Sequence, residues 1–202
     1  MMTLLAGALI FGCAAVCGIV LATLYCARFT PFEDGPKLGP ARPAALVAGA
    51  VVLGIAMVAR HAPLLELGLS ALLCVPLAAA WYSDAAKGIV PDVFTLGPLA
   101  VVAVYVVVHH SWWVGLSAIV PFVPFAIAAM FSKGRGMGWG DAKLVALGGA
   151  VLGMQTAVLA FAVACFVATV VAVVRDRGKT AVAFAPYLVA SIVIAMVLQV
   201  HG

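Results

Sequence analysis

Residues 136–174 read GMGWGDAKLVALGGAVLGMQTAVLAFAVACFVATVVAVV, and this stretch decides the fold. It begins with alternating glycines and two charged residues, Asp141 and Lys143, and then continues without charge to Val174. A single helix over 143–174 would be about 48 Å long, well beyond a hydrocarbon core of about 30 Å. The segment Gly153-Met-Gln-Thr156 is the natural break. We therefore expect a short sixth segment from about Asp141 to Gly153, followed by a full-length one.

The composition places the whole chain in a membrane. Its 202 residues are 66% hydrophobic and 9% charged, and the mean hydropathy is +1.25, values far from those of soluble domains. The sequence predicts an all-α, polytopic transmembrane helix bundle of about eight segments, the sixth short or broken. The first segment is long enough to be a span and is expected to stay as a helix. The other apolar runs are 4–27, 44–59, 63–83, 94–109, 112–131 and 184–200.

The positions of Lys and Arg predict the orientation, because loops on the cytoplasmic side collect basic residues. With a break near Gly153, only Arg60 of the 11 basic residues falls on the opposite side, and both termini are outside. The protein is thus expected in the inner (plasma) membrane, in contact with lipid. The net charge of +4 follows from this bias and requires no nucleic-acid partner. The basic side holds Arg28, Lys37, Arg42, Lys87, Lys133, Arg135, Lys143, Arg175, Arg177 and Lys179.

Two acids are the candidate catalytic residues. Asp84 closes the third span and Asp141 opens the sixth, with two spans between them. An even number of crossings returns the chain to the same face, so both carboxyls are expected at cytoplasmic helix ends. If they approach, both cannot ionise easily and the pair shares one proton. One carboxylate could then activate a water while its protonated partner donates to a peptide carbonyl, which is aspartyl proteolysis.

The glycines before Asp141 allow two interpretations. Gly136, Gly138 and Gly140 remove side chains at alternate positions, so that another backbone, such as a peptide substrate, could approach Asp141 closely. Alternatively, Gly140 ends a turn and Asp141 only caps the following helix.

The remaining charged residues near these segments have structural interpretations. Asp92 follows Pro91 at the start of the fourth span and is expected to be an N-cap. Glu66 is expected in the first turn of the third span, where the helix dipole favours an anion. Lys143 could pair with Asp141, meet lipid phosphates or serve only as a topology signal.

No pattern of Cys or His residues indicates a metal or cofactor. The five cysteines are nearly all within apolar runs and are expected to be packing residues, although Cys13 and Cys17 share a helix face. The histidines are expected near the outer ends of spans, without the spacing of metal ligands. These residues are Cys13, Cys17, Cys26, Cys74, Cys165, His61, His109, His110 and His201.

The paired motifs resemble those of the type IV prepilin peptidase family of membrane aspartyl proteases. In this sequence they are Asp84, seven residues before Pro91 in Ile-Val-Pro-Asp92, and Gly138-Trp-Gly-Asp141-Ala-Lys143-Leu. The resemblance extends from about Trp81 to Leu188 and includes the final-span segment Phe184-Ala-Pro-Tyr-Leu188. It implies that Asp84 and Asp141 are the catalytic pair, that Gly138 and Gly140 complete the signature, and that Pro91 and Lys143 lie near the substrate.

The resemblance also implies a substrate and a division of the chain. Family members remove the short basic leader of prepilin-like proteins on the cytoplasmic face, next to the substrate's hydrophobic helix. Residues 81–188 would be the peptidase core, preceded by 1–80 and followed by 189–202, the end of the last span. Many members also methylate the new N-terminus and carry paired Cys-X-X-Cys motifs in a large first loop. The loop at 28–43 is short and has no cysteine, so methyl transfer and zinc are not expected.

Two other classes of function remain open at this stage. A small transporter or channel could use buried acids to relay protons or bind cations, and it predicts acids near the bilayer midplane. A structural membrane component would use its acids only as helix caps and would tolerate Asp84→Ala.

Overall fold

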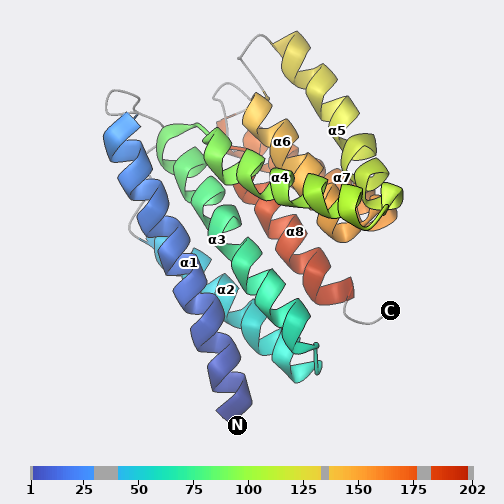
Figure 1. The fold of residues 1–202 in the computed structure, drawn as a ribbon. Coiled ribbons are helices and arrows are strands. Elements are labelled where there is room, and N and C mark those ends of the chain that lie inside the picture. Colours follow the sequence, from blue (N-terminus) through green and yellow to red (C-terminus); the bar gives the residue numbers. More distant parts are fainter. Residues whose placement is uncertain (1, 30–40, 133–136, 177–182, 200–202) are drawn as a thin grey trace. The chain divides into compact units, whose positions relative to one another are not determined.

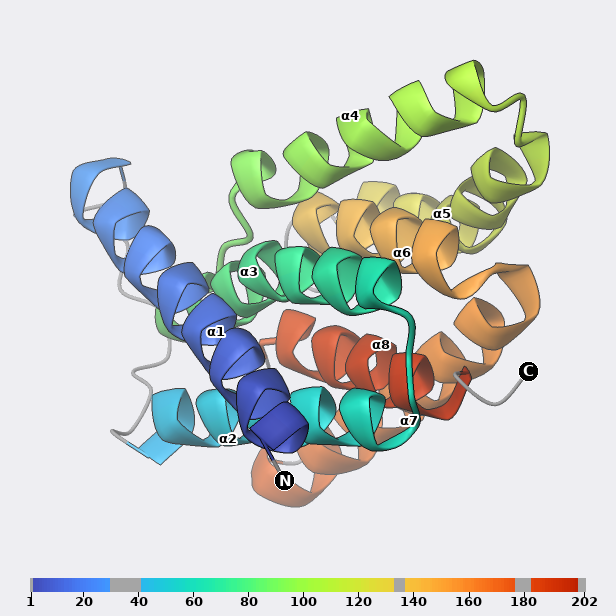
Figure 2. The same cartoon turned by 60° about the horizontal axis from the view of Figure 1, so that its bottom comes forward.

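The computed structural model describes residues 2–29, 41–132, 137–176 and 183–199, and helices account for its regular structure, with no strand in these ranges. The predicted all-α class is confirmed, with eight helices in the expected order (Figures 1 and 2). They are α1 (Met2–Phe29), α2 (Ala41–Ala59), α3 (Leu64–Lys87), α4 (Asp92–Val108), α5 (Trp112–Ser132), α6 (Trp139–Leu152), α7 (Met154–Asp176) and α8 (Ala185–Gln199).

The predicted break in the long apolar run is confirmed at Gly153, the single residue between α6 and α7. Gly153 has φ 75° and ψ 159°, a combination that is essentially restricted to glycine. The chain therefore reverses within one residue instead of continuing as one long helix. The short helix begins at Trp139, two residues before the expected start at Asp141.

The chain forms two compact units, the first comprising residues 1–88 with 196–202 and the second residues 89–195. In the first unit, α1 packs against α2 and α3. A Cβ atom on Gly54 would lie 2.4 Å from the Gly7 carbonyl oxygen, and one on Gly18 would lie 2.3 Å from that of Val75. Glycine is thus required at both crossings, as is common between membrane helices.

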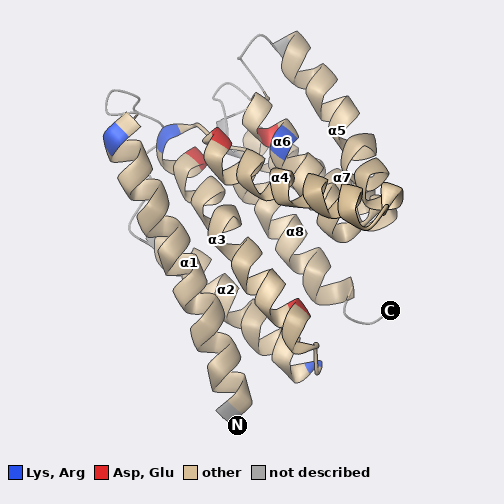
Figure 3. Cartoon of the chain, in the orientation of Figure 1, with Lys and Arg blue, Asp and Glu red and all other residues tan. Residues whose placement is uncertain are grey.

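Charged residues of the first unit lie at or near the ends of its helices (Figure 3). Arg28 is in the last turn of α1 and Lys87 is in the last turn of α3. Arg60 follows α2, and Glu66 lies in the first turn of α3, as predicted. Apart from these residues, from Arg42 at the start of α2 and from Asp84 near the end of α3, the described parts of α1, α2 and α3 carry no charge, so the helices present a long apolar surface.

Helix α6 is the core of the second unit. It lies beside α4 and α5 and leads directly into α7 (Figure 2). A Cβ atom on Gly149 would lie 2.3 Å from the Ser117 carbonyl oxygen of α5, and one on Gly148 would lie 2.6 Å from Phe161 of α7. Two adjacent glycines thus let different neighbours approach α6 from different directions. Nine of its 14 residues are buried: Asp141, Ala142, Leu144, Val145, Ala146, Leu147, Gly148, Gly149 and Leu152.

The outer surfaces of the helices are suited to lipid. Four helices are long and apolar enough to cross a membrane, and three shorter ones are also apolar. Large hydrophobic side chains point outward, including Leu64 at 88% exposure and Phe131 at 82%. Exposure of so much apolar surface to water is unfavourable, whereas its contact with the hydrocarbon of a membrane is not.

Candidate active site

Asp84 is buried in the last turn of α3. Its exposure is 6%, and the adjacent Ser83 and Ala85 are 0% and 1% exposed. The helix continues to Lys87 and ends at Gly88, whose left-handed φ of 71° suits glycine. The Gly88 amide donates a hydrogen bond to the Asp84 carbonyl oxygen at 2.7 Å. Asp84 thus lies within α3, three residues before the last residue of the helix, Lys87.

Asp141 is buried in the first turn of α6, also at 6% exposure. Gly138 occupies the N-cap position, and Asp141 is the third residue of the helix. The Gly138 amide donates to Asp141 Oδ2 at 3.1 Å. Asp141 Oδ1 is buried and has no hydrogen-bond partner among the described residues. The two oxygens of one carboxyl therefore have different environments.

The capping interpretation of Asp141 explains only half of this carboxyl group. Oδ2 satisfies an amide at the helix start, as a capping acid does, although from the third helical position and not from the N-cap. A buried oxygen without a donor costs free energy, about 1–3 kcal/mol for an ordinary polar group and more for a charged one. Such an exception in a folded protein calls for an explanation, and a catalytic role is one of them.

Gly140 brings the start of α6 against the segment before α4. A Cβ atom on Gly140 would lie 2.6 Å from Val90 Cβ and 3.1 Å from the Val90 carbonyl oxygen. The expected close backbone approach at this glycine therefore exists, and the neighbour is Val90 of the same chain. Gly138 has no such constraint, because its nearest contact would be Asp141 Oδ2 at 3.5 Å. Gly136 lies outside the described residues.

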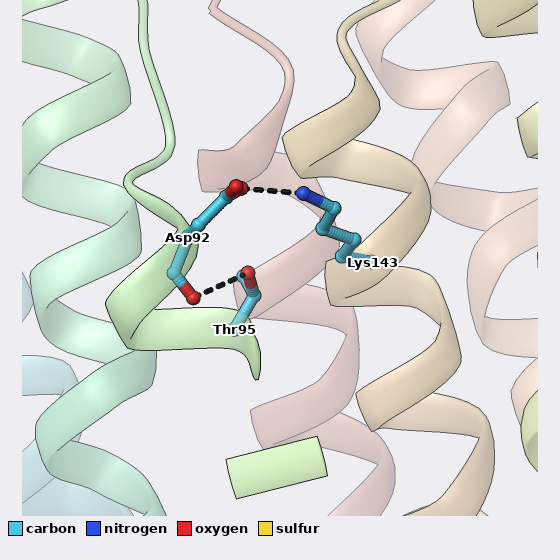
Figure 4. A network of polar contacts seen from close by, with 3 residues as sticks. All are labelled: Asp92, Thr95 and Lys143. Carbon is cyan, nitrogen blue, oxygen red and sulfur yellow. Dashed lines mark hydrogen bonds and ion pairs between the residues drawn. The ribbon is translucent and has the colours of Figure 1, made fainter. Parts of the chain in front are cut away.

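An ion pair joins the same two segments, two residues after Val90 and three residues after Gly140. Lys143 Nζ lies 2.5 Å from Asp92 Oδ1 (Figure 4). The Lys143 side chain is 24% exposed and that of Asp92 is 61% exposed. Thr95, which is fully buried, donates from Oγ1 to the Asp92 carbonyl oxygen at 3.3 Å. The first turn of α4 is thereby held against the first turns of α6.

Two sequence predictions need correction here. Asp92 is not an N-cap: α4 begins at Asp92 itself, Pro91 holds the cap position, and no side chain makes a cap hydrogen bond there. Lys143 pairs with Asp92 and not with Asp141. Sequence reasoning missed both the pair and the Val90 contact, because the two segments are far apart in the chain, with a separation of 51 residues between Asp92 and Lys143. The one available signal is that Pro91-Asp92 and Gly-X-Gly-Asp-X-Lys occur together in this chain.

The remaining Cys, His and acidic residues of the described segments do not cluster as metal ligands. The described residues include no group of three or more His, Cys, Asp or Glu side chains that could hold a metal ion. None of the five cysteines, all of which the structure describes, forms a disulfide; Cys26 and Cys74 are buried, whereas Cys13 and Cys17 are exposed on α1. His61 and His110 occupy left-handed turn positions after α2 and α4.

These features define a class of protein, a helical membrane protein with two buried acids in the end turns of its helices. Comparison with models of known protein families then identifies the family. A model of the type IV leader peptidase family matches residues 71–173, about half of the chain, and this range contains both acids and both motifs. The chain belongs to the type IV leader peptidase family and is a membrane peptidase. No curated protein and no solved structure matches it.

Proposed function

We propose that this protein is an aspartyl endopeptidase that removes the leader peptide of type IV prepilin-like proteins at the cytoplasmic face. Asp84 and Asp141 are its catalytic residues. The observation that carries the proposal is Asp141 Oδ1, a buried carboxyl oxygen without a hydrogen-bond partner among the described residues, within the segment matched by the peptidase family.

The chemistry follows from two carboxyls that hold one proton between them. The ionised carboxylate removes a proton from water as the water oxygen attacks the scissile carbonyl carbon. The protonated partner donates to the carbonyl oxygen, and the leaving amine then takes up a proton as the C–N bond breaks. The reaction consumes only water, and it requires no metal or cofactor.

The local structure supports the pairing of the two acids in three ways. Both are equally buried, and both lie in the terminal turn of a helix. The charge pattern predicts these turns on the same, basic face of the membrane. In the sequence, Asp84 is only six residues before Val90, the residue that packs on Gly140 next to Asp141.

The proposed substrate fits the chemistry of this protein's surface. A prepilin has a hydrophobic segment that would lie in the membrane against the exposed apolar faces of the helices. Its basic leader would extend to the face where the acids lie. Residues Gly138 and Trp139, exposed beside Asp141, would then be near the scissile bond.

The test is cleavage of a membrane-embedded prepilin by the purified full-length protein. Asp84→Asn and Asp141→Asn should each abolish cleavage, because Asn has nearly the same shape as Asp but cannot carry the proton. Glu66→Gln, at the opposite end of the Asp84 helix, is the matched control and should keep wild-type activity. The thermal unfolding temperature of each variant in detergent establishes that it is folded. Cleavage by either folded Asn variant would defeat the proposal.

A flux measurement separates this function from transport. Proteoliposomes that contain the wild-type protein should show no proton or cation flux that depends on Asp84 or Asp141. Acids in the end turns of α3 and α6 suit cleavage near the membrane surface better than relay at the midplane. Acid-dependent flux without cleavage would favour the transporter.

A further inference from the structure

We infer that Asp92 and Lys143 are positioning residues for Asp141, acting as one ion pair that sets the register of α6 against the start of α4. This inference rests on the proposed peptidase function and assigns a role to two residues outside the catalytic pair. Neither residue is proposed to touch the substrate or to transfer a proton.

The geometry of the contact is the first argument. Val90 and Asp92 flank Pro91, which is buried and fixes the backbone between them. Gly140 and Lys143 flank Asp141 on α6. Val90 packs against Gly140, and Asp92 binds Lys143. Asp141 is therefore held between two attachment points to the same short segment of chain.

The two contacts restrict α6 in complementary ways. The Gly140 contact limits how closely α6 can approach, since it is an encounter between atoms with no room for a further methyl group. The ion pair adds attraction and direction at a distance of 2.5 Å. Together the two contacts restrict sliding and rotation of the first turns of α6 more than packing alone would.

The exposure of the two side chains indicates that the ion pair contributes more to the position of α6 than to the free energy of unfolding. Asp92 is 61% and Lys143 24% exposed, and partly exposed ion pairs contribute little to the free energy of unfolding. A catalytic carboxyl is far more sensitive, because a misplacement of about 1 Å can reduce turnover by about a hundredfold. Loss of the pair should thus affect kcat much more than stability.

The experiment measures kcat, KM and thermal unfolding for a cycle of variants. Asp92→Asn and Lys143→Met should each lower kcat by about ten- to a hundredfold, with KM and the unfolding temperature nearly unchanged. Lys143→Arg, which keeps the charge, should retain most of the activity. The exchanged double variant, Asp92→Lys with Lys143→Asp, should recover kcat relative to the two charge-reversing single variants, because it restores an attractive pair of the same combined length.

Each other result overturns the inference. Unchanged kcat in the neutralised variants would leave the pair without a positioning role, and a raised KM with unchanged kcat would make these residues substrate-binding. If the exchanged double variant is folded but does not recover kcat, the two residues act separately. The proposed function fails in a different way, when the wild-type protein does not cleave or when the Asn variants of Asp84 or Asp141 still do.

Discussion

Asp141 shows how one residue can serve both folding and chemistry. Its Oδ2 accepts the Gly138 amide hydrogen bond, which anchors the carboxyl at the start of α6. Its Oδ1 is left without a partner among the described residues. A carboxyl with both oxygens satisfied would be a stable cap with little capacity to receive a proton from water.

Gly140 gives the first prediction at the residue scale. Gly140→Ala places a methyl group 2.6 Å from Val90 Cβ, so the start of α6 must shift away from Val90. Overpacking of this kind costs about 1–3 kcal/mol of stability, and Asp141 moves with its helix. We expect both a lower unfolding temperature and a marked loss of prepilin cleavage.

The control for this prediction is Gly97→Ala in α4, where a Cβ atom would meet nothing within 4 Å. That variant should keep its activity and be as stable as the wild type or slightly more so, because alanine favours helix over glycine by about 1 kcal/mol. Normal cleavage by Gly140→Ala would mean that the Val90 contact does not position the site.

At this scale the sequence predicted the types of residues better than their partners. Asp84, Asp141 and the glycines are conspicuous in an apolar chain because acids there are costly. The contacts that these residues make cannot be predicted from the sequence in the same way. Asp92 is expected from the sequence to be a cap, and Lys143 has three possible roles, none of them a bond to Asp92, whereas folding brings these two together across 51 residues.

At the scale of elements, α6 depends on small residues for its central position. Gly149→Ala would place a methyl group 2.3 Å from the Ser117 carbonyl oxygen, and a backbone atom cannot rotate away. We expect a loss of about 1–3 kcal/mol, measured as lower resistance to thermal unfolding in detergent. Gly115→Ala, on α5, is the control because its nearest neighbour, Val106, is at an ordinary 3.6 Å. Equal stability of the two variants would contradict this packing.

The reversal between α6 and α7 gives a second prediction for elements. Gly153→Ala puts a Cβ on a residue with φ 75° and ψ 159°, where backbone strain costs on the order of 1–3 kcal/mol. Its surroundings are open, with nothing within 4 Å of the added atom, so the effect is due to backbone conformation alone. A thermal unfolding curve that matches the wild type would show that the turn tolerates an L-residue.

Helix order and the broken run were predictable because they follow from length and charge. An uninterrupted helix over residues 143–174 exceeds the bilayer, and the basic residues near 175 favour one side only if the run is broken. Helix ends were less predictable: α3 continues past Asp84 to Lys87, and α6 begins at Trp139. Both differences occur where a glycine, and not the end of the apolar run, sets the terminus.

At the scale of the whole molecule, the charge bias predicts which helix ends share a face. In a variant without native cysteines, Arg60→Cys should react with a membrane-impermeant maleimide in intact cells, since the charge bias predicts residue 60 on the outer side. Lys87→Cys should react only after permeabilisation. The reverse pattern would place the acids on the outer face.

The proposed function, in which acids of α3 and α6 share a proton, predicts a bell-shaped dependence of cleavage rate on pH. At low pH both carboxyls are protonated and no base remains, whereas at high pH both are ionised and no acid remains. The measurement is kcat/KM for a prepilin across pH, with unfolding followed over the same range as a control. A rate that stays constant while pH changes widely would argue against a carboxyl pair.

The brevity of α6 has a consequence for the membrane itself. At 14 residues the helix reaches about 21 Å, whereas an undistorted hydrocarbon layer measures about 30 Å. Because nine of its residues are buried and α4, α5 and α7 pack around it, neighbouring helices and not lipid set the position of α6. If Asp141 lies at the headgroup level of one face, the other end of α6 stops roughly 9 Å short of the opposite headgroups, so the reversal at Gly153 falls inside the hydrocarbon layer.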